Sequence, residues 1–211
     1  MNANFSDVEQ RVKRYWFKDG IGELAGGGLF LVIGLYFAGH EWMPPSSLAR
    51  TLLDSSLVIV LIGGIFVTRW LVNLLKIRLT YPRTGYVEYI PSQKNTRSRR
   101  ILTAAIAMGV SMLLALFGQL IGSFNWISAF TGLAIGVVFI MTKARGGDGR
   151  FYILGGLSII LGVAFAFIEL PESYSLGLFY GSMGMAAMIS GGLTLARYLR
   201  ENPMPKEESN E

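Results

Sequence analysis

The amino-acid sequence predicts an all-α integral membrane protein with six transmembrane helices, arranged as three helix hairpins with both termini in the cytoplasm. Composition, the length of the apolar runs and the placement of basic residues all indicate this class. Of the 211 residues, 52% are hydrophobic and 16% are charged, whereas about 25% are charged in an average soluble domain. Several apolar runs reach the roughly 20 residues that cross a bilayer. The composition therefore argues against an ordinary soluble domain.

Six apolar segments alternate with polar turns along the chain. Their expected bounds are 20–39, 52–75, 101–121, 125–142, 151–168 and 173–197, within a transmembrane domain of residues 20–200. The third and fourth belong to one uncharged run, 101–142, which is too long for a single crossing. The turn-prone sequence Gly122-Ser123-Phe124-Asn125 divides that run into two spans.

The basic residues predict the orientation. With six spans, 18 of the 19 lysine and arginine residues fall on one side of the membrane, and only Arg50 falls on the other. The positive-inside rule then places both termini and the long loop in the cytoplasm, at the plasma (inner) membrane. An odd number of spans would break this segregation.

The two ends of the chain are polar. Ser6-Asp7-Val8-Glu9 forms a capping box, and apolar residues after it recur on one helical face. Residues 1–19 are therefore expected to form a cytoplasmic amphipathic helix at the membrane interface, with an ordinary solvated helix as the alternative. Residues 201–211 are polar, contain two prolines and are expected to be a disordered cytoplasmic tail.

The loop 76–100 is the long polar segment between the second and third spans. Arg78–Tyr81 and Tyr86–Tyr89 are strand-prone and flank a turn sequence, which predicts a short β-hairpin-like structure. Its basic residues are candidate contacts for anionic lipid or a cytoplasmic partner. These residues are Lys76, Arg78, Arg83, Lys94, Arg97, Arg99 and Arg100.

Parts of the first hairpin resemble parts of the third. Residues 27–34 resemble 155–162, and residues 64–71 resemble 192–199. A true repeat of parallel hairpins is one interpretation, and shared glycine-rich composition is the other. Small residues four positions apart predict close helix contacts, as in Gly22/Gly26, Gly132/Gly136 and Gly177/Gly181.

Charged residues near the span ends are candidate intramembrane partners. They are Asp19, Glu23, Arg69, Asp148 and Arg197. The repeat predicts that Asp19 pairs with Arg69 and that Asp148 pairs with Arg197. The alternatives for Arg69 are a pair with Glu23 or a side chain that reaches the headgroups alone.

No catalytic, cofactor-binding or metal-binding residue is expected. The chain has no cysteine, and its single histidine, His40, excludes a multi-histidine metal site within one chain. Gly20–Ala25 matches a dinucleotide fingerprint in letters, but a basic segment rather than a strand precedes it. The net charge of +5 follows from the positive-inside bias, so nucleic acid is not an expected partner.

Two segments, YPRTGYVEY at 81–89 and YWFKDGIGELAGG at 15–27, resemble stretches of uncharacterised prokaryotic multi-pass membrane proteins. The resemblance implies no activity and no binding residue. The sequence thus predicts a non-enzymatic accessory or scaffold module that engages anionic inner-leaflet lipid or a cytoplasmic protein through its basic face. A homo-oligomer is compatible with this prediction. The alternatives are a small transporter or channel built from parallel hairpin repeats and, third, an intramembrane enzyme.

Overall fold

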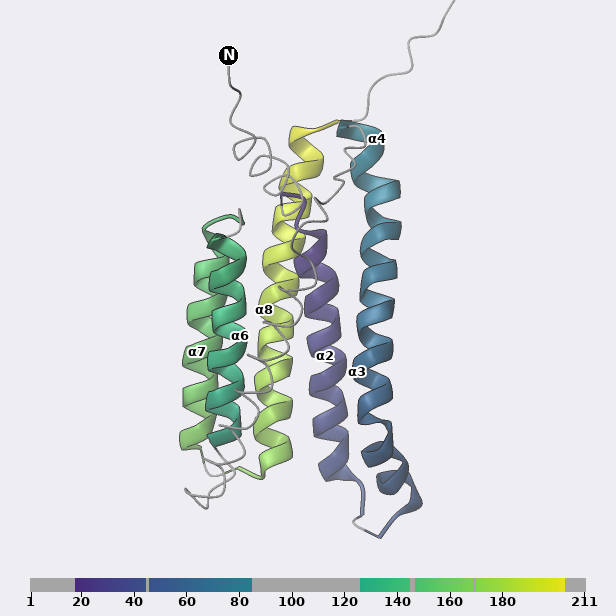
Figure 1. The fold of residues 1–211 in the computed structure, drawn as a ribbon, viewed down its shortest axis with the longest axis vertical. Helices are drawn as coiled ribbons and strands as arrows, with labels where there is room; N and C mark the ends of the chain where they lie inside the picture. Colours follow the sequence, from purple (N-terminus) through teal and green to yellow (C-terminus); the bar gives the residue numbers. More distant parts are fainter. Residues whose placement is uncertain (1–17, 45, 85–125, 145–146, 169, 204–211) are drawn as a thin grey trace, which may run out of the picture.

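The structure is a bundle of long helices that run side by side (Figure 1). The computed structural model describes residues 18–44, 46–84, 126–144, 147–168 and 170–203. The long helices of this part are α2 (Ile21–Trp42), α3 (Leu48–Leu75), α6 (Trp126–Ala144), α7 (Arg150–Phe167) and α8 (Glu172–Glu201). Each is long and apolar enough to span a membrane. The described part of the chain is therefore that of an all-helical membrane protein.

The described helices begin and end within four residues of the expected bounds. The largest difference at a start is in α3, which begins at Leu48 rather than at 52. Ser47 explains the earlier start, because its side-chain oxygen accepts the N–H of Arg50 at 3.2 Å and so caps the helix. The expected span 101–121, most of the segment 1–19 and residues 204–211 of the tail lie outside the described residues.

The bundle has two ends, which we name after one residue at each. At the Asp19 end, α2 and α7 begin while α6 and α8 end, and Arg83 after α3 donates to the carbonyl of Leu199 on α8. At the His40 end, Trp126 at the start of α6 contacts Phe167 at the end of α7. The Asp19 end is the upper one in Figure 1, where the short helix α4 (Tyr81–Thr84) is labelled.

Helices α2 and α8 pack against each other with their backbones in contact at glycines. Built on Gly27, a Cβ atom would lie 2.7 Å from the carbonyl oxygen of Gly184, so no larger residue fits without a shift. In lipid such close backbone approach allows strong van der Waals packing. The contact repeats every seven residues. Gly20 just before α2, and Gly27 and Gly34 on α2, meet Gly191, Gly184 and Gly177 on α8.

A second close contact of the same kind joins α6 to α7. A Cβ on Gly132 would lie 2.7 Å from the Cα of Gly162, and one on Gly136 would lie 2.9 Å from the carbonyl oxygen of Gly155. The predicted contact role of Gly132 and Gly136 is thus confirmed. For the pair at 22 and 26 the described residues show no such contact, because none of their atoms lies within 4 Å of a Cβ at either position.

The first half of the predicted β-hairpin is helical instead. Residues Lys76–Thr80 form a π-helical turn, η1, that continues α3, and Tyr81–Thr84 form the short helix α4. Strand propensity depends strongly on context, and here Lys76 and Thr80 both reach Asp19 from the continued helix. The predicted second strand lies outside the described residues.

Candidate functional site

A buried ion pair joins the start of α2 to the end of α3. The carboxylate of Asp19 is 3.3 Å from the ammonium of Lys76, and both side chains are almost fully buried, at 2% and 3% exposed. The hydroxyl of Thr80 donates to the same carboxylate, and the N–H of Ile21 donates to its other oxygen. Because a buried charge is costly unless it is paired and hydrogen-bonded, these partners make Asp19 a structural anchor.

A second buried cluster joins α2, α7 and α8. The Nε of Arg150 lies 2.6 Å from the carboxylate of Glu23, whose side chain is 5% exposed. The hydroxyl of Ser190 donates to the other carboxylate oxygen at 2.8 Å. Arg150 also donates to the hydroxyl of Thr194 and lies 3.3 Å from the carboxylate of Asp148. The Glu23 carboxylate is therefore held from two neighbouring helices.

The predicted charge pairs are wrong in their partners. Asp19 pairs with Lys76 rather than Arg69, and Asp148 contacts Arg150 rather than Arg197. Arg69 and Arg197 are exposed, and within the described part of the chain neither forms an ion pair. The physical reason is depth: Arg69 precedes Lys76 by seven residues, which is about 10 Å along a helix.

The sequence held weak signals of the true partners. Lys76 and Thr80 are four residues apart, which places them on one helical face. Arg150 follows the Asp148-Gly149 turn directly, at the point where the fifth span begins. Neither signal identifies a partner on another helix, so the two clusters required the tertiary structure.

Only some of the predicted lipid contacts are available to lipid. Lys76 is buried in its ion pair, so the expectation that it contacts lipid or a partner is wrong. Arg83 donates to the carbonyl oxygens of Leu199 and Asn202 and so satisfies the C-terminal end of α8. Arg78 is exposed. The remaining candidates, Lys94, Arg97, Arg99 and Arg100, lie outside the described residues.

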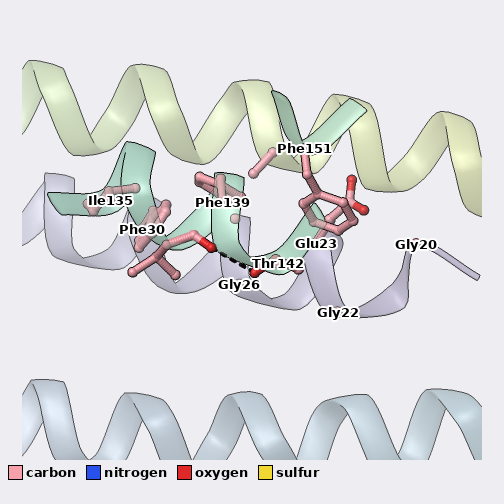
Figure 2. A pocket seen from close by; sticks show the side chains of 12 residues that line it. Gly20, Gly22, Glu23, Gly26, Phe30, Ile135, Phe139, Thr142 and Phe151 are labelled. Carbon is pink, nitrogen blue, oxygen red and sulfur yellow. Dashed lines mark hydrogen bonds between the residues drawn. The ribbon is translucent and has the colours of Figure 1, made fainter. Parts of the chain in front are cut away.

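A cavity of about 330 Å³ lies next to the Glu23 cluster, between α2, α6, α7 and α8. Figure 2 shows the Glu23 carboxylate at one part of its wall, near the ring of Phe151. The hydroxyl of Thr142 is turned to the carbonyl of Val138 on its own helix. The lining is otherwise mainly apolar, with Gly22 and Gly26 leaving space on the α2 side. The cavity suits an apolar or amphiphilic group.

A polar cluster around the single histidine lies at the His40 end. The Nε2 of His40 is 2.8 Å from a carboxylate oxygen of Asp54 on α3. Its Nδ1 is 3.3 Å from a guanidinium nitrogen of Arg50, and also 3.3 Å from the hydroxyl of Ser173 on α8. The carboxylate of Glu41 stands 3.8 Å from Nδ1. One imidazole therefore links three helices.

This cluster has the residue types of a nucleophile, a base and an orienting carboxylate. The hydroxyl of Ser173, however, shares the Nδ1 of His40 with the guanidinium of Arg50. The nitrogen that would take up the serine proton therefore already contacts a cation. A nitrogen that accepts from a guanidinium is a weak base for a serine proton. In the described ranges, no three histidine, aspartate or glutamate side chains come close enough to hold a metal ion.

Comparison with known protein families, curated proteins and solved structures gives no match. Function is therefore inferred from the two ends of the bundle and from the cavity between its helices.

Proposed function

We propose that this protein is a six-span inner-membrane protein with its Asp19 end in the cytoplasm. The course of the chain supports a sixth span. Thr84 lies at the Asp19 end and Trp126 at the His40 end, so a chain that joins them would have to cross the membrane an odd number of times. The 41 residues between them are too few for three crossings of about 20 residues each. The uncharged segment 101–121 would supply the single crossing.

The register of the close contacts supports an arrangement of three hairpins. The start of the third hairpin, α7, packs on α6 of the hairpin before it, and α2 packs on α8. If the first helix of each hairpin packs on the second helix of the hairpin before it, segment 101–121 would pack on α3. Three small residues on α3 also recur every seven positions: Ala49, Ser56 and Gly63. Each lies 128 positions before one of the α8 glycines that contact α2, which are Gly177, Gly184 and Gly191.

The function that the geometry supports best is a membrane module that binds anionic headgroups through its Asp19 end. One observation carries this proposal. Exposed basic residues gather on the segments at that end, while on the described segments of the His40 end Arg50 stands alone. Lysine and arginine near an anionic leaflet each contribute about 1 kcal/mol of attraction. The exposed residues are Lys18, Arg69, Arg78, Arg197 and Arg200.

Lipid dependence of the purified full-length protein tests this function. We would measure its thermal unfolding in nanodiscs of neutral lipid and of lipid with added phosphatidylglycerol. Binding to the folded state raises the unfolding temperature, so the anionic discs should stabilise the protein, and salt should weaken the effect.

A charge-neutral variant and a matched control make the test specific. Replacing Arg78, Arg197 and Arg200 together by glutamine should remove most of the stabilisation, because these side chains are exposed and sit at the Asp19 end. The single change Arg50→Gln at the other end should leave the difference between the lipids in place. Equal stability of the parent protein in neutral and anionic discs would contradict lipid binding and favour an acidic cytoplasmic protein as the partner.

A small transporter is the second candidate, and one observation favours it. The wall of the cavity carries the Glu23 carboxylate within a membrane-spanning helix, where a charged group is costly unless it has a role. The pairing of Glu23 with Arg150 and Ser190 gives it a structural role as well. Solute flux into liposomes that disappears in Glu23→Gln, with the fold retained, would support transport.

A further inference from the structure

We propose that the cavity next to the Glu23 cluster binds a small apolar molecule whose head donates hydrogen bonds, above all a primary alkylamine. The proposal concerns binding inside the bundle, so it depends neither on lipid binding at the Asp19 end nor on transport. It rests on the polar groups of the cavity wall, on the size of the cavity and on the depth of its two ends.

The polar side chains of the wall offer acceptors to a ligand. Of the described residues that line the cavity, only Glu23 and Thr142 carry polar side-chain groups. In its ion pair with Arg150, Glu23 is a carboxylate, which only accepts hydrogen bonds. The hydroxyl of Thr142 already donates its hydrogen to the carbonyl of Val138, so its oxygen can only accept another bond. The head of a bound molecule must therefore supply the hydrogens.

The carboxylate of Glu23 has capacity for a further partner. Among the described residues, Arg150 donates to one of its oxygens and Ser190 to the other. A carboxylate has about four lone-pair sites, so two of them remain. The cluster also places two carboxylates, of Glu23 and Asp148, around the single guanidinium of Arg150, which leaves a net negative charge. A primary ammonium would supply both the hydrogens and the balancing charge.

The rest of the wall suits an apolar body. The cavity volume is about 330 Å³, and an engineered apolar cavity of about 150 Å³ already binds benzene. The rings of Phe30, Phe139 and Phe151 line the cavity, and the last two stack with their centroids 6.2 Å apart. By comparison with benzene, the cavity has room for a ring with a short chain, on the order of ten non-hydrogen atoms.

The two ends of the cavity lie at different depths in the bundle. Glu23 is in the first turn of α2 and Thr142 is near the end of α6, so both lie close to the Asp19 end. Phe30 and Ile135 are seven residues further into the same two helices, which is about 10 Å deeper. Figure 2 shows these two side chains away from Glu23. An amphiphile can therefore bind with its head near the membrane surface and its body toward the bilayer centre.

The cavity opens between α2 and α6. Gly22 on α2 and Val138 on α6 both line it and are both exposed. The close glycine contacts of these helices are made elsewhere, by α2 with α8 and by α6 with α7. A molecule dissolved in the membrane can thus enter sideways between the two helices.

Photoaffinity labelling of the purified full-length protein tests the proposal. The protein would be placed in nanodiscs of phosphatidylcholine, so that binding of anionic lipid does not contribute. The probe is phenylbutylamine with a photoreactive diazirine on its ring, and mass spectrometry identifies the labelled residues. We expect labelling of Phe30 and Phe139 that saturates and that excess phenylbutylamine suppresses. Val58 and Ile62, exposed on α3, report the labelling from the bilayer, which should not saturate.

Unlabelled competitors with the same body isolate the effect of the head. Phenylbutanol keeps a hydrogen-bond donor without a charge, phenylbutanoate has a head that only accepts, and butylbenzene has no head. We expect the amine to compete best, followed by the alcohol and then butylbenzene, and the carboxylate to compete least. The loss of a hydrogen bond to a charged group weakens binding by roughly tenfold or more. Equal competition by the amine and the carboxylate would overturn the assignment of the head.

Two glycine variants and one glutamate variant connect the labelling to the cavity. Gly26→Leu should abolish saturable labelling, because the new side chain would enter the cavity. Gly28→Leu on the same helix is the matched control and should leave labelling unchanged, because Gly28 does not line the cavity. Glu23→Gln should remove the advantage of the amine over the alcohol.

The competitor series in the parent protein keeps the proposal testable even if Glu23→Gln does not fold. Saturable labelling that persists in Gly26→Leu would place the binding site elsewhere and overturn the proposal. The absence of saturable labelling in the parent protein would also overturn it, and would indicate that another part of the chain, such as segment 101–121, fills the cavity.

Discussion

At the residue scale, the buried carboxylates of Asp19 and Glu23 pair with other basic residues than the sequence predicts. Lys76 and Thr80 bond to the carboxylate of Asp19. Arg150 and Ser190 bond to the carboxylate of Glu23. A buried charge that loses its partner is strongly destabilising, at roughly 3–5 kcal/mol. These clusters therefore fix the depth at which α2 meets its neighbours.

Glu23 and Arg150 should be energetically coupled. We expect Glu23→Gln and Arg150→Gln each to lower thermal stability in detergent, and the double variant to be more stable than the sum of both losses predicts. Contacting residues show coupling of roughly 0.5–3 kcal/mol, and their atoms lie 2.6 Å apart.

Arg69 is the matched control for this double-mutant cycle. It is exposed and, within the described residues, has no acidic partner. Arg69→Gln combined with Glu23→Gln should therefore be additive. Coupling of Glu23 to Arg69, without coupling to Arg150, would contradict the pairing.

At the scale of elements, two glycine-lined contacts organise the bundle. In each, one helix backbone touches another through small residues four or seven positions apart: α2 on α8 and α7 on α6. Glycine in a helix costs about 1 kcal/mol relative to alanine, and close packing offsets that cost only where another helix approaches.

Adjacent glycines on α2 provide a direct comparison. Gly27→Ala should destabilise the protein by about 1–3 kcal/mol, because its Cβ would lie 2.7 Å from the backbone of α8. Gly28→Ala should be neutral or stabilising by up to about 1 kcal/mol, because no atom of the described residues lies within 4 Å of that position. Thermal unfolding of both variants measures the difference. Equal effects of the two changes would show that the α2–α8 contact is looser than described.

The proposed contact between segment 101–121 and α3 can be cross-linked. Segment 101–121 carries its own small residues seven positions apart, Ala104, Ser111 and Gly118. If they met Gly63, Ser56 and Ala49 of α3 in antiparallel order, as the glycines of α2 and α8 meet, Ser111 would lie opposite Ser56, and Ser111→Cys with Ser56→Cys should form an intramolecular disulfide. Val58, two residues further along α3 and exposed, gives the control partner that should not react. The Oγ atoms of Ser128 and Ser175 lie 2.7 Å apart, so the corresponding cysteines give the positive control.

The mobility of the protein on a non-reducing gel separates the outcomes. A disulfide-linked dimer would indicate that a second copy of the chain covers this face of α3. The absence of a Ser56-to-Ser111 disulfide, while the positive control reacts, would contradict the three-hairpin arrangement.

At the scale of the whole molecule, orientation in the membrane follows from the charge difference between the two ends. Exposed basic residues gather at the Asp19 end, so that end should face the cytoplasm. In intact cells, an impermeant thiol reagent should label Ser46→Cys at the His40 end and leave Arg200→Cys unlabelled. Both residues are exposed, so access alone does not bias the result. The opposite labelling pattern would reverse the orientation.

The sequence by itself determined the class of the protein and the approximate bounds of the described helices. Apolar length and turn residues suffice for this, because a bilayer requires about 20 apolar residues per helix whatever lies beside it. The same local information fails at Arg78–Tyr81. There strand-prone residues continue α3 as a helix because Lys76 and Thr80 reach Asp19, 57 and 61 positions away in the chain.

Only the tertiary structure decided which polar groups meet. Arg150 reaches Glu23 across 127 positions, and Ser173 reaches His40 across 133. Sequence spacing identifies groups on one helical face, whereas these contacts depend on which helices are neighbours and at what depth they cross. That arrangement is set by backbone contact at glycines such as Gly27 and Gly184, and its register cannot be derived from one helix alone.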